Sequence, residues 1–291
     1  MRETIFRWAA IIMAIISFGI AAYFAGKIYY TEQEYAEGDA VYEEILEQAV
    51  VTMPEVPGEN PEPDGEAESQ IAQESQKEER DSIVPEIDFA ALKAVNEDVV
   101  GWLYLPDTVI SYPVVQGEDN SYYLKHLVDG TYNANGCLFM DYKNQRNLMD
   151  DNTLIYGHHM DSGKMFASLV KYKNQEFYDT HPVMYFLTED GTYQVELFAG
   201  YTTTADAGAY MISISTREEK IEWLKEMFHS SDFFADVTVS ALDHIVTWIV
   251  NSKLNNFFKV ILPVLNWCQV TERGMKSVIV KPIHIISKPQ F

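Results

Sequence analysis

Between residues 99 and 247 the sequence is divided into short apolar runs that are bounded by turn-forming residues. Runs of this length suit β-strands, because a helix in a globular domain usually needs ten or more residues. Glu189-Asp190-Gly191 is a hairpin signal between two of the runs. The pattern predicts a mostly β fold, a β-barrel with helical insertions. The runs cover residues 99–105, 112–115, 137–140, 153–156, 183–187, 193–199 and 244–247.

Two helices are predicted beside these strands. The first begins after Asp88 and has apolar residues at positions 89, 92 and 95, a spacing that suits a short amphipathic helix. The second begins at Thr216, which can form a capping box with Glu219, and its apolar residues at 221, 224 and 228 share one face.

The N-terminal segment, residues 1–30, has the character of a membrane anchor. Arg2 and Arg7 precede a stretch without charge from residue 8 to 26, and the apolar segment is about as long as a bilayer-spanning helix. The positive-inside rule then predicts a cytoplasmic N-terminus and an extracellular domain in a single-pass membrane protein. A cleaved signal peptide is the alternative, but the apolar region is long and lacks a clear small-x-small cleavage site.

Residues 31–87 are expected to form an acidic, disordered stalk. Residues 31–86 contain 18 Asp and Glu against only Lys77 and Arg80, and residues 54–65 are rich in proline, glycine and acids. Such a composition buries too little apolar area to offset the entropy of ordering the chain, although residues 43–51 have the pattern of a short helix. The formal net charge of −23 argues against a nucleic-acid partner.

Several separate stretches, in order, resemble the class B sortase family. They are NEDVVGWLYLPDT at 96–108, ISYPVVQG at 110–117, GCLFMDY at 136–142, NTLIYGHHM at 152–160 and DHIVT at 243–247. The resemblance covers about residues 88–247, which we take as the catalytic domain. It implies a sortase-like closed β-barrel with short helices, displayed on a Gram-positive cell surface.

The resemblance also implies an activity, that of a cysteine transpeptidase. Such an enzyme cleaves a sorting motif near the C-terminus of an exported protein through a thioacyl intermediate. An amine of peptidoglycan or of a protein subunit then takes the acyl group. The reaction needs an ionised thiol, a histidine for proton transfer and a cationic donor, and it implies no metal or organic cofactor.

His158 matches the catalytic histidine of the family, at the end of an apolar strand. The family motif after the 243–247 strand is Thr-Leu-x-Thr-Cys, whereas residues 247–251 of this chain read Thr-Trp-Ile-Val-Asn. Asn251 therefore stands where the nucleophile is expected, and a carboxamide has no ionisable sulfur. His159 is the adjacent residue, and neighbouring positions on a strand point to opposite faces, which argues against a metal ion held by both histidines.

Two accounts of residues 248–291 remain open. In the first, this segment is a foreign tail, because its net charge is +5 whereas that of residues 1–247 is −28. In the second, about 17 inserted residues precede a resumed motif, so that Cys268 is the nucleophile and Lys276 or Arg273 replaces the family's arginine. Lysine lacks the planar fork of arginine and is a poor bidentate replacement.

The other cysteine, Cys137, lies within a predicted strand and is expected to be buried and inert. Two cysteines are too few for a disulfide framework. Three functions follow: a sortase, a sortase-like module that binds a sorting peptide without cleaving it, or a damaged relic. The relic is an alternative because loss of the last strands of a barrel exposes a sheet edge.

Overall fold

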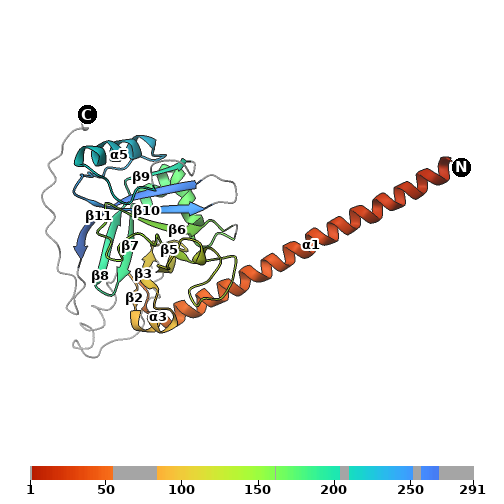
Figure 1. Ribbon diagram of the computed structural model, residues 1–291, viewed down its shortest axis with the longest axis horizontal. Coiled ribbons are helices and arrows are strands. Elements are labelled where there is room, and N and C mark those ends of the chain that lie inside the picture. The colour runs from red at the N-terminus through yellow and green to blue at the C-terminus, as the bar shows by residue number, and fades with distance from the viewer. Residues whose placement is uncertain (1, 55–83, 161, 204–209, 252–256, 269–291) are drawn as a thin grey trace, which may run out of the picture.

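The computed structural model describes residues 2–54, 84–160, 162–203, 210–251 and 257–268 (Figure 1). Its centre is a curled mixed β-sheet with the strand order β10-β6-β5-β4-β3-β7-β8-β11-β9. The strands are β3 (Val99–Tyr104), β4 (Ser111–Val115), β5 (Leu138–Met140), β6 (Asn152–His158), β7 (Val183–Thr188), β8 (Gly191–Glu196), β9 (Ala199–Thr203), β10 (His244–Asn251) and β11 (Phe257–Cys268). The predicted mostly β architecture is thus confirmed as a curled mixed sheet with short helices.

Most neighbouring strands are antiparallel, but β4 pairs with β5, and β6 with β10, in parallel. β7 and β8 form the hairpin predicted at residues 189–191. The run at 193–199 was predicted as a single strand and is instead divided between β8 and β9. The division follows from pairing, because β8 continues the hairpin with β7 whereas β9 pairs with β11.

Short helices cover the sheet, and both predicted ones are confirmed. They are η1 (Tyr122–Leu124), η2 (Phe166–Lys173), α3 (Phe89–Val95), α4 (Gln175–Thr180) and α5 (Arg217–Ser230). At the start of α3 the Asp88 side chain accepts a hydrogen bond from the Ala91 amide at 2.9 Å. At the start of α5 the Thr216 hydroxyl accepts one from the Glu219 amide at 3.2 Å. Both bonds satisfy amides that the first helical turn leaves unpaired.

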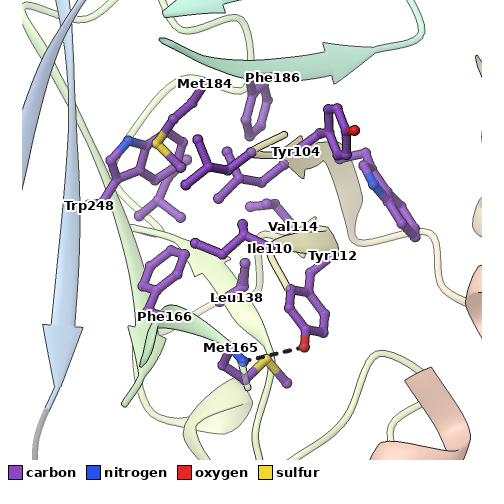
Figure 2. Close-up of a cluster of buried hydrophobic side chains, with 14 of the residues drawn as sticks. Tyr104, Ile110, Tyr112, Val114, Leu138, Met165, Phe166, Met184, Phe186 and Trp248 are labelled. Atoms are coloured by element: carbon purple, nitrogen blue, oxygen red, sulfur yellow. Dashed lines mark hydrogen bonds between the residues drawn. The ribbon is translucent and has the colours of Figure 1, made fainter. Parts of the chain in front are cut away.

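The core crosses the boundary that the sequence suggested between residues 247 and 248. Trp248 is fully buried, and its ring centroid lies 6.1 Å from that of Phe166 and 6.4 Å from that of Phe186 (Figure 2). β10 runs through this position without a break, so a domain boundary there is wrong for the described residues. Packing explains the difference, since the apolar residues 248–250 continue the same buried strand.

The stalk expected over residues 31–87 is wrong in its first third. A single helix, α1 (Arg2–Ala49), continues through it and projects from the domain (Figure 1). Tyr42, Ile45 and Ala49 are 7%, 5% and 1% exposed, so one apolar face of an acidic helix is buried. Overall composition hides this face, because the acidic residues lie around it. After α1, β1 (Val50–Thr52) pairs with β2 (Glu86–Ile87), while residues 55–83 lie outside the described part.

The first part of α1 contains one segment long and apolar enough to cross a membrane, and this segment is not buried by the domain. A signal sequence near an N-terminus shares this length and composition. With 48 residues α1 is about 72 Å long, because an α-helix rises about 1.5 Å per residue.

Candidate active site

A cavity of about 260 Å³ lies at the end of β6, and His158 is the last residue of that strand. The histidine side chain is half-buried. The cavity is lined by Asn120, Leu124, Phe139, Tyr156, Gly157, His158 and Ile249. The lining is mostly apolar with a few polar groups, which is the usual make-up of a ligand site.

Gly157 explains how β6 can bring His158 to this edge. A Cβ atom at this glycine would lie 2.5 Å from side-chain carbons of both Leu138 and Phe166. Any larger residue would therefore push the strand away from the core. The close packing fixes the backbone immediately before His158.

The imidazole of His158 is held by the segments that precede β5. Its Nε2 lies 2.9 Å from the carbonyl oxygen of Leu124. Because a carbonyl only accepts hydrogen bonds, Nε2 carries the proton, and in the neutral ring Nδ1 has the free lone pair. Gly136, with φ of 59°, packs against the other side: a Cβ there would lie 3.0 Å from the histidine Cδ2.

Sequence reasoning missed a polar network beside the histidine. The Tyr156 hydroxyl donates to Asp141 Oδ2 at 2.9 Å, and the Asn120 amide donates to the same oxygen at 2.8 Å. Burial, then the nearby Asp141, raises the pKa of Tyr156, so its phenol stays neutral. All three residues lie in or beside the stretches that resemble the family, which is the signal that could have identified them.

No lysine or arginine is among the described residues that line the cavity. The cation that the family's reaction needs is therefore not supplied by this part of the wall. The described residues also contain no group of three or more His, Cys, Asp or Glu that could hold a metal ion.

The strand register determines which candidate nucleophile lies beside His158. β10 runs parallel to β6, and Asn251 is the register partner of His158. Asn251 also pairs with Phe257, the first residue of β11. Cys268 is eleven residues further along β11 and pairs with Thr192. Eleven residues of strand span about 36 Å, so the described backbone brings Asn251, and not Cys268, to the histidine.

The remaining candidates do not contribute to the cavity wall as described. Lys276 and Arg273 lie outside the described residues. Cys137 is 1% exposed, and burial raises the pKa of its thiol to about 12. A thiol of that kind is almost wholly protonated at neutral pH, so Cys137 is the inert core residue that the sequence predicts.

Two curated proteins are similar to this chain in sequence. Sortase B of Listeria monocytogenes is 38% identical over 156 residues, which cover 54% of this chain and 63% of the relative. Sortase B of Staphylococcus aureus is 33% identical over 159 residues, 55% of this chain and 65% of the relative. The aligned part thus spans slightly less than two thirds of either relative. No family model matches the chain.

Solved structures agree with this similarity. Sortase B from Bacillus anthracis superposes with a TM-score of 0.64 at 30% identity, over 81% of this chain and 99% of that one. Sortase B of S. aureus, solved with a bound substrate and with a glycine ligand, gives a TM-score of 0.60 at 30% identity, over 63% of this chain and 85% and 86% of those chains. The fold and the histidine-edged cavity define a sortase, a class of cysteine transpeptidases. Within that class, the chain belongs to the sortase B family.

Proposed function

We propose that the cavity beside His158 binds the sorting motif of an exported protein, as the peptide site of a class B-type sortase. Family membership supports this, as does the S. aureus relative, which was solved with a bound substrate. The apolar start of α1 supports the accompanying proposal of a single-pass membrane anchor with a cytoplasmic N-terminus and an extracellular domain.

The reaction for which such a site is built has two acyl-transfer steps. A thiolate attacks the scissile carbonyl, the histidine protonates the departing amine, and the peptide remains as a thioacyl group. A second amine, from peptidoglycan or a protein subunit, then displaces the sulfur, and a glycine acceptor is consistent with the glycine ligand of the S. aureus relative. We propose that His158 supplies the proton transfer in both steps.

For this chain we infer that the peptide is bound but the thioacyl step does not occur. The observation that carries this inference is the pairing of Asn251 with His158, because it sets a carboxamide at the place of the thiol. A carboxamide is neither ionised nor nucleophilic at neutral pH. The chain then acts as a sorting-peptide binding module.

The alternative is catalysis by Cys268 with Lys276 or Arg273. It requires β11 to leave its pairing with β8, since Cys268 is paired with Thr192 there. β11 pairs with β8 on one side and with β10 on the other, and we propose that it thereby closes the curled sheet into a barrel. Release of the strand would open the barrel, which disfavours this alternative.

Restoring a thiol at position 251 tests the proposal. We expect the parent chain to bind fluorescent peptides that carry C-terminal sorting motifs of exported proteins from its source organism, with no covalent adduct in mass spectrometry. Asn251→Cys should form a thioester with the same peptides. The double variant with His158→Gln should lose about 10²- to 10⁴-fold of the rate of adduct formation, the usual contribution of a general acid or base.

A matched control is Cys268→Ala in both backgrounds. We expect it to leave peptide affinity and the Asn251→Cys adduct unchanged. An adduct in the parent chain that disappears in Cys268→Ala would establish the alternative. If neither the parent chain nor Asn251→Cys binds any peptide of the panel, the proposed function is refuted.

A further inference from the structure

Helix α1 is joined to the loop that packs against His158. The Tyr42 hydroxyl donates to the carbonyl oxygen of Gly136 at 2.6 Å. The Ala134 amide donates to Glu34 Oε1 at 3.0 Å. Asn133 and Asn135 donate from their side chains to carbonyl oxygens of the same helix, at 2.7 and 3.1 Å. Each of the four residues from 133 to 136 is thus hydrogen-bonded to α1.

Gly136 connects this interface to the histidine. A Cβ on Gly136 would lie 2.7 Å from the Tyr123 carbonyl oxygen, 2.9 Å from the Leu124 carbonyl oxygen and 3.0 Å from the ring of His158. Leu124 contributes the carbonyl that accepts the histidine Nε2–H. The backbone that Tyr42 holds is therefore in van der Waals contact with both the imidazole and its hydrogen-bond acceptor.

The same helix also holds the segment that follows His158. Lys164 Nζ lies 3.2 Å from Asp39 Oδ2 and 3.5 Å from Glu43 Oε1 of α1. The next residue, Met165, donates its amide to the Tyr112 hydroxyl at 3.3 Å, and the Tyr112 ring packs edge-on against that of Tyr42 at 5.5 Å. Met165 also forms a β-bridge with His159, the neighbour of the histidine.

We propose that residues 34–43 of α1 form a positioning element for His158, with Tyr42 as the positioning residue. The segment contacts the histidine through the 133–136 loop on one side and the 159–165 segment on the other. The helix that carries the apolar N-terminal segment thus also orients the imidazole, so a helix detached from the domain leaves the ring free to turn. The inference rests on the proposed role of His158, but its test needs neither peptide nor turnover.

The test is a pair of hydroxyl deletions in the full-length chain in detergent micelles. Tyr42→Phe removes the bond to the Gly136 carbonyl. Tyr172→Phe is the matched control, because the Tyr172 hydroxyl is also buried and donates to a backbone carbonyl, that of His181, at 2.7 Å. The readout is the ¹⁵N spectrum of selectively labelled histidine, in which His158→Gln identifies the signal of interest.

We expect Tyr42→Phe to move the His158 Nε2 resonance and to raise solvent exchange of the Nε2 proton about fivefold, the effect of losing one typical hydrogen bond. Tyr172→Phe should leave both unchanged. An unchanged His158 signal in Tyr42→Phe would overturn the proposal, because it would leave α1 as a support without influence on the ring.

A second arm guards against a general loss of folding in the first. Lys164→Glu should move the same resonance, because it repels Asp39 and Glu43. The charge-exchanged variant Lys164→Glu with Asp39→Lys should restore the parent signal, since it rebuilds the ion pair. Failure of the exchange to restore the signal would also count against the proposal. Because no arm contains peptide, failure here is distinct from failure of peptide binding or of the Asn251→Cys adduct.

Discussion

A single methyl group added to α1 should have the opposite effect from the one that helix propensity predicts. In an isolated helix Gly38→Ala stabilises by about 1 kcal/mol, because glycine loses more conformational entropy than alanine on folding. Here a Cβ at Gly38 would lie 2.5 Å from Asn135 Nδ2 and 2.7 Å from Asn133 Oδ1. Both asparagines are almost fully buried, so they cannot simply turn into solvent.

The size of the effect follows from the bonds that these asparagines make. Displacing them endangers the bond from Asn133 to the Glu34 carbonyl, the bond from Asn135 to the Tyr35 carbonyl, and the 2.8 Å bond between the Asn135 amide and Asn133 Oδ1. At about 1 kcal/mol each, the loss is about 3 kcal/mol. Subtracting the gain of about 1 kcal/mol in the helix leaves a net cost of about 2 kcal/mol to docking, or about a 30-fold larger undocked population.

Hydrogen exchange at Ala134 measures this population, because its amide is bonded across the interface to Glu34. We expect exchange to rise about 30-fold in Gly38→Ala. The control is Gly26→Ala, the same change in the same helix at a site with no neighbouring atom within 4 Å, and it should have no effect at Ala134. Equal or slower exchange in Gly38→Ala would refute the docked arrangement of α1.

Two further predictions concern ionisable groups. Asp151 pairs with the buried Lys220 at 2.7 Å, and although burial alone raises the pKa of Asp151, this pair and the Ile214 amide lower it overall. Asp151→Ala should therefore reduce the free energy of unfolding by about 2 kcal/mol at pH 7, between the values for exposed and buried pairs, and the difference from the parent chain in urea unfolding should shrink as the pH falls below about 4. A difference that is the same at pH 3 and pH 7 would contradict the assignment to charge. In a Cys268→Ala background, Cys137 should react with a thiol reagent at pH 8 only as the protein unfolds, since a pKa of about 12 leaves about one thiolate in ten thousand; rapid labelling of the folded chain would show that the thiol is accessible.

The strands and short helices of the domain were predictable because their signals are local. A buried strand such as β7 needs only a run of apolar residues between turn residues, and the capping bond at Thr216 depends on residues three apart. The family resemblance also drew attention to His158, which the structure puts at the rim of the cavity. What α1 does after residue 30 was not predictable in this way, because its apolar face becomes visible only when the partner surface is known.

The polar network of the cavity was missed for a similar reason. Asp141 and Tyr156 are fifteen residues apart and meet only because β5 and β6 pair. Asn120 reaches the same carboxylate from the segment before η1. No sequence spacing predicts such a contact, since it depends on the register of two strands and on the path of a loop.

The segment after residue 247 illustrates the difference between what a fold and what a reaction requires of a sequence. Strand pairing depends on backbone groups and on apolar side chains at the buried positions, and residues 248–250 meet that requirement with exposures of 1% or less. The fit is imperfect, because the Trp248 indole N–H has no hydrogen-bond partner among the described residues, at a cost of about 1–3 kcal/mol. Catalysis instead depends on one atom at one position, and no apolar compensation elsewhere replaces the sulfur missing at Asn251. An altered C-terminal segment can therefore complete the sheet, with some strain, while it removes the nucleophile, and this is why binding without cleavage is the function that the register of β10 favours.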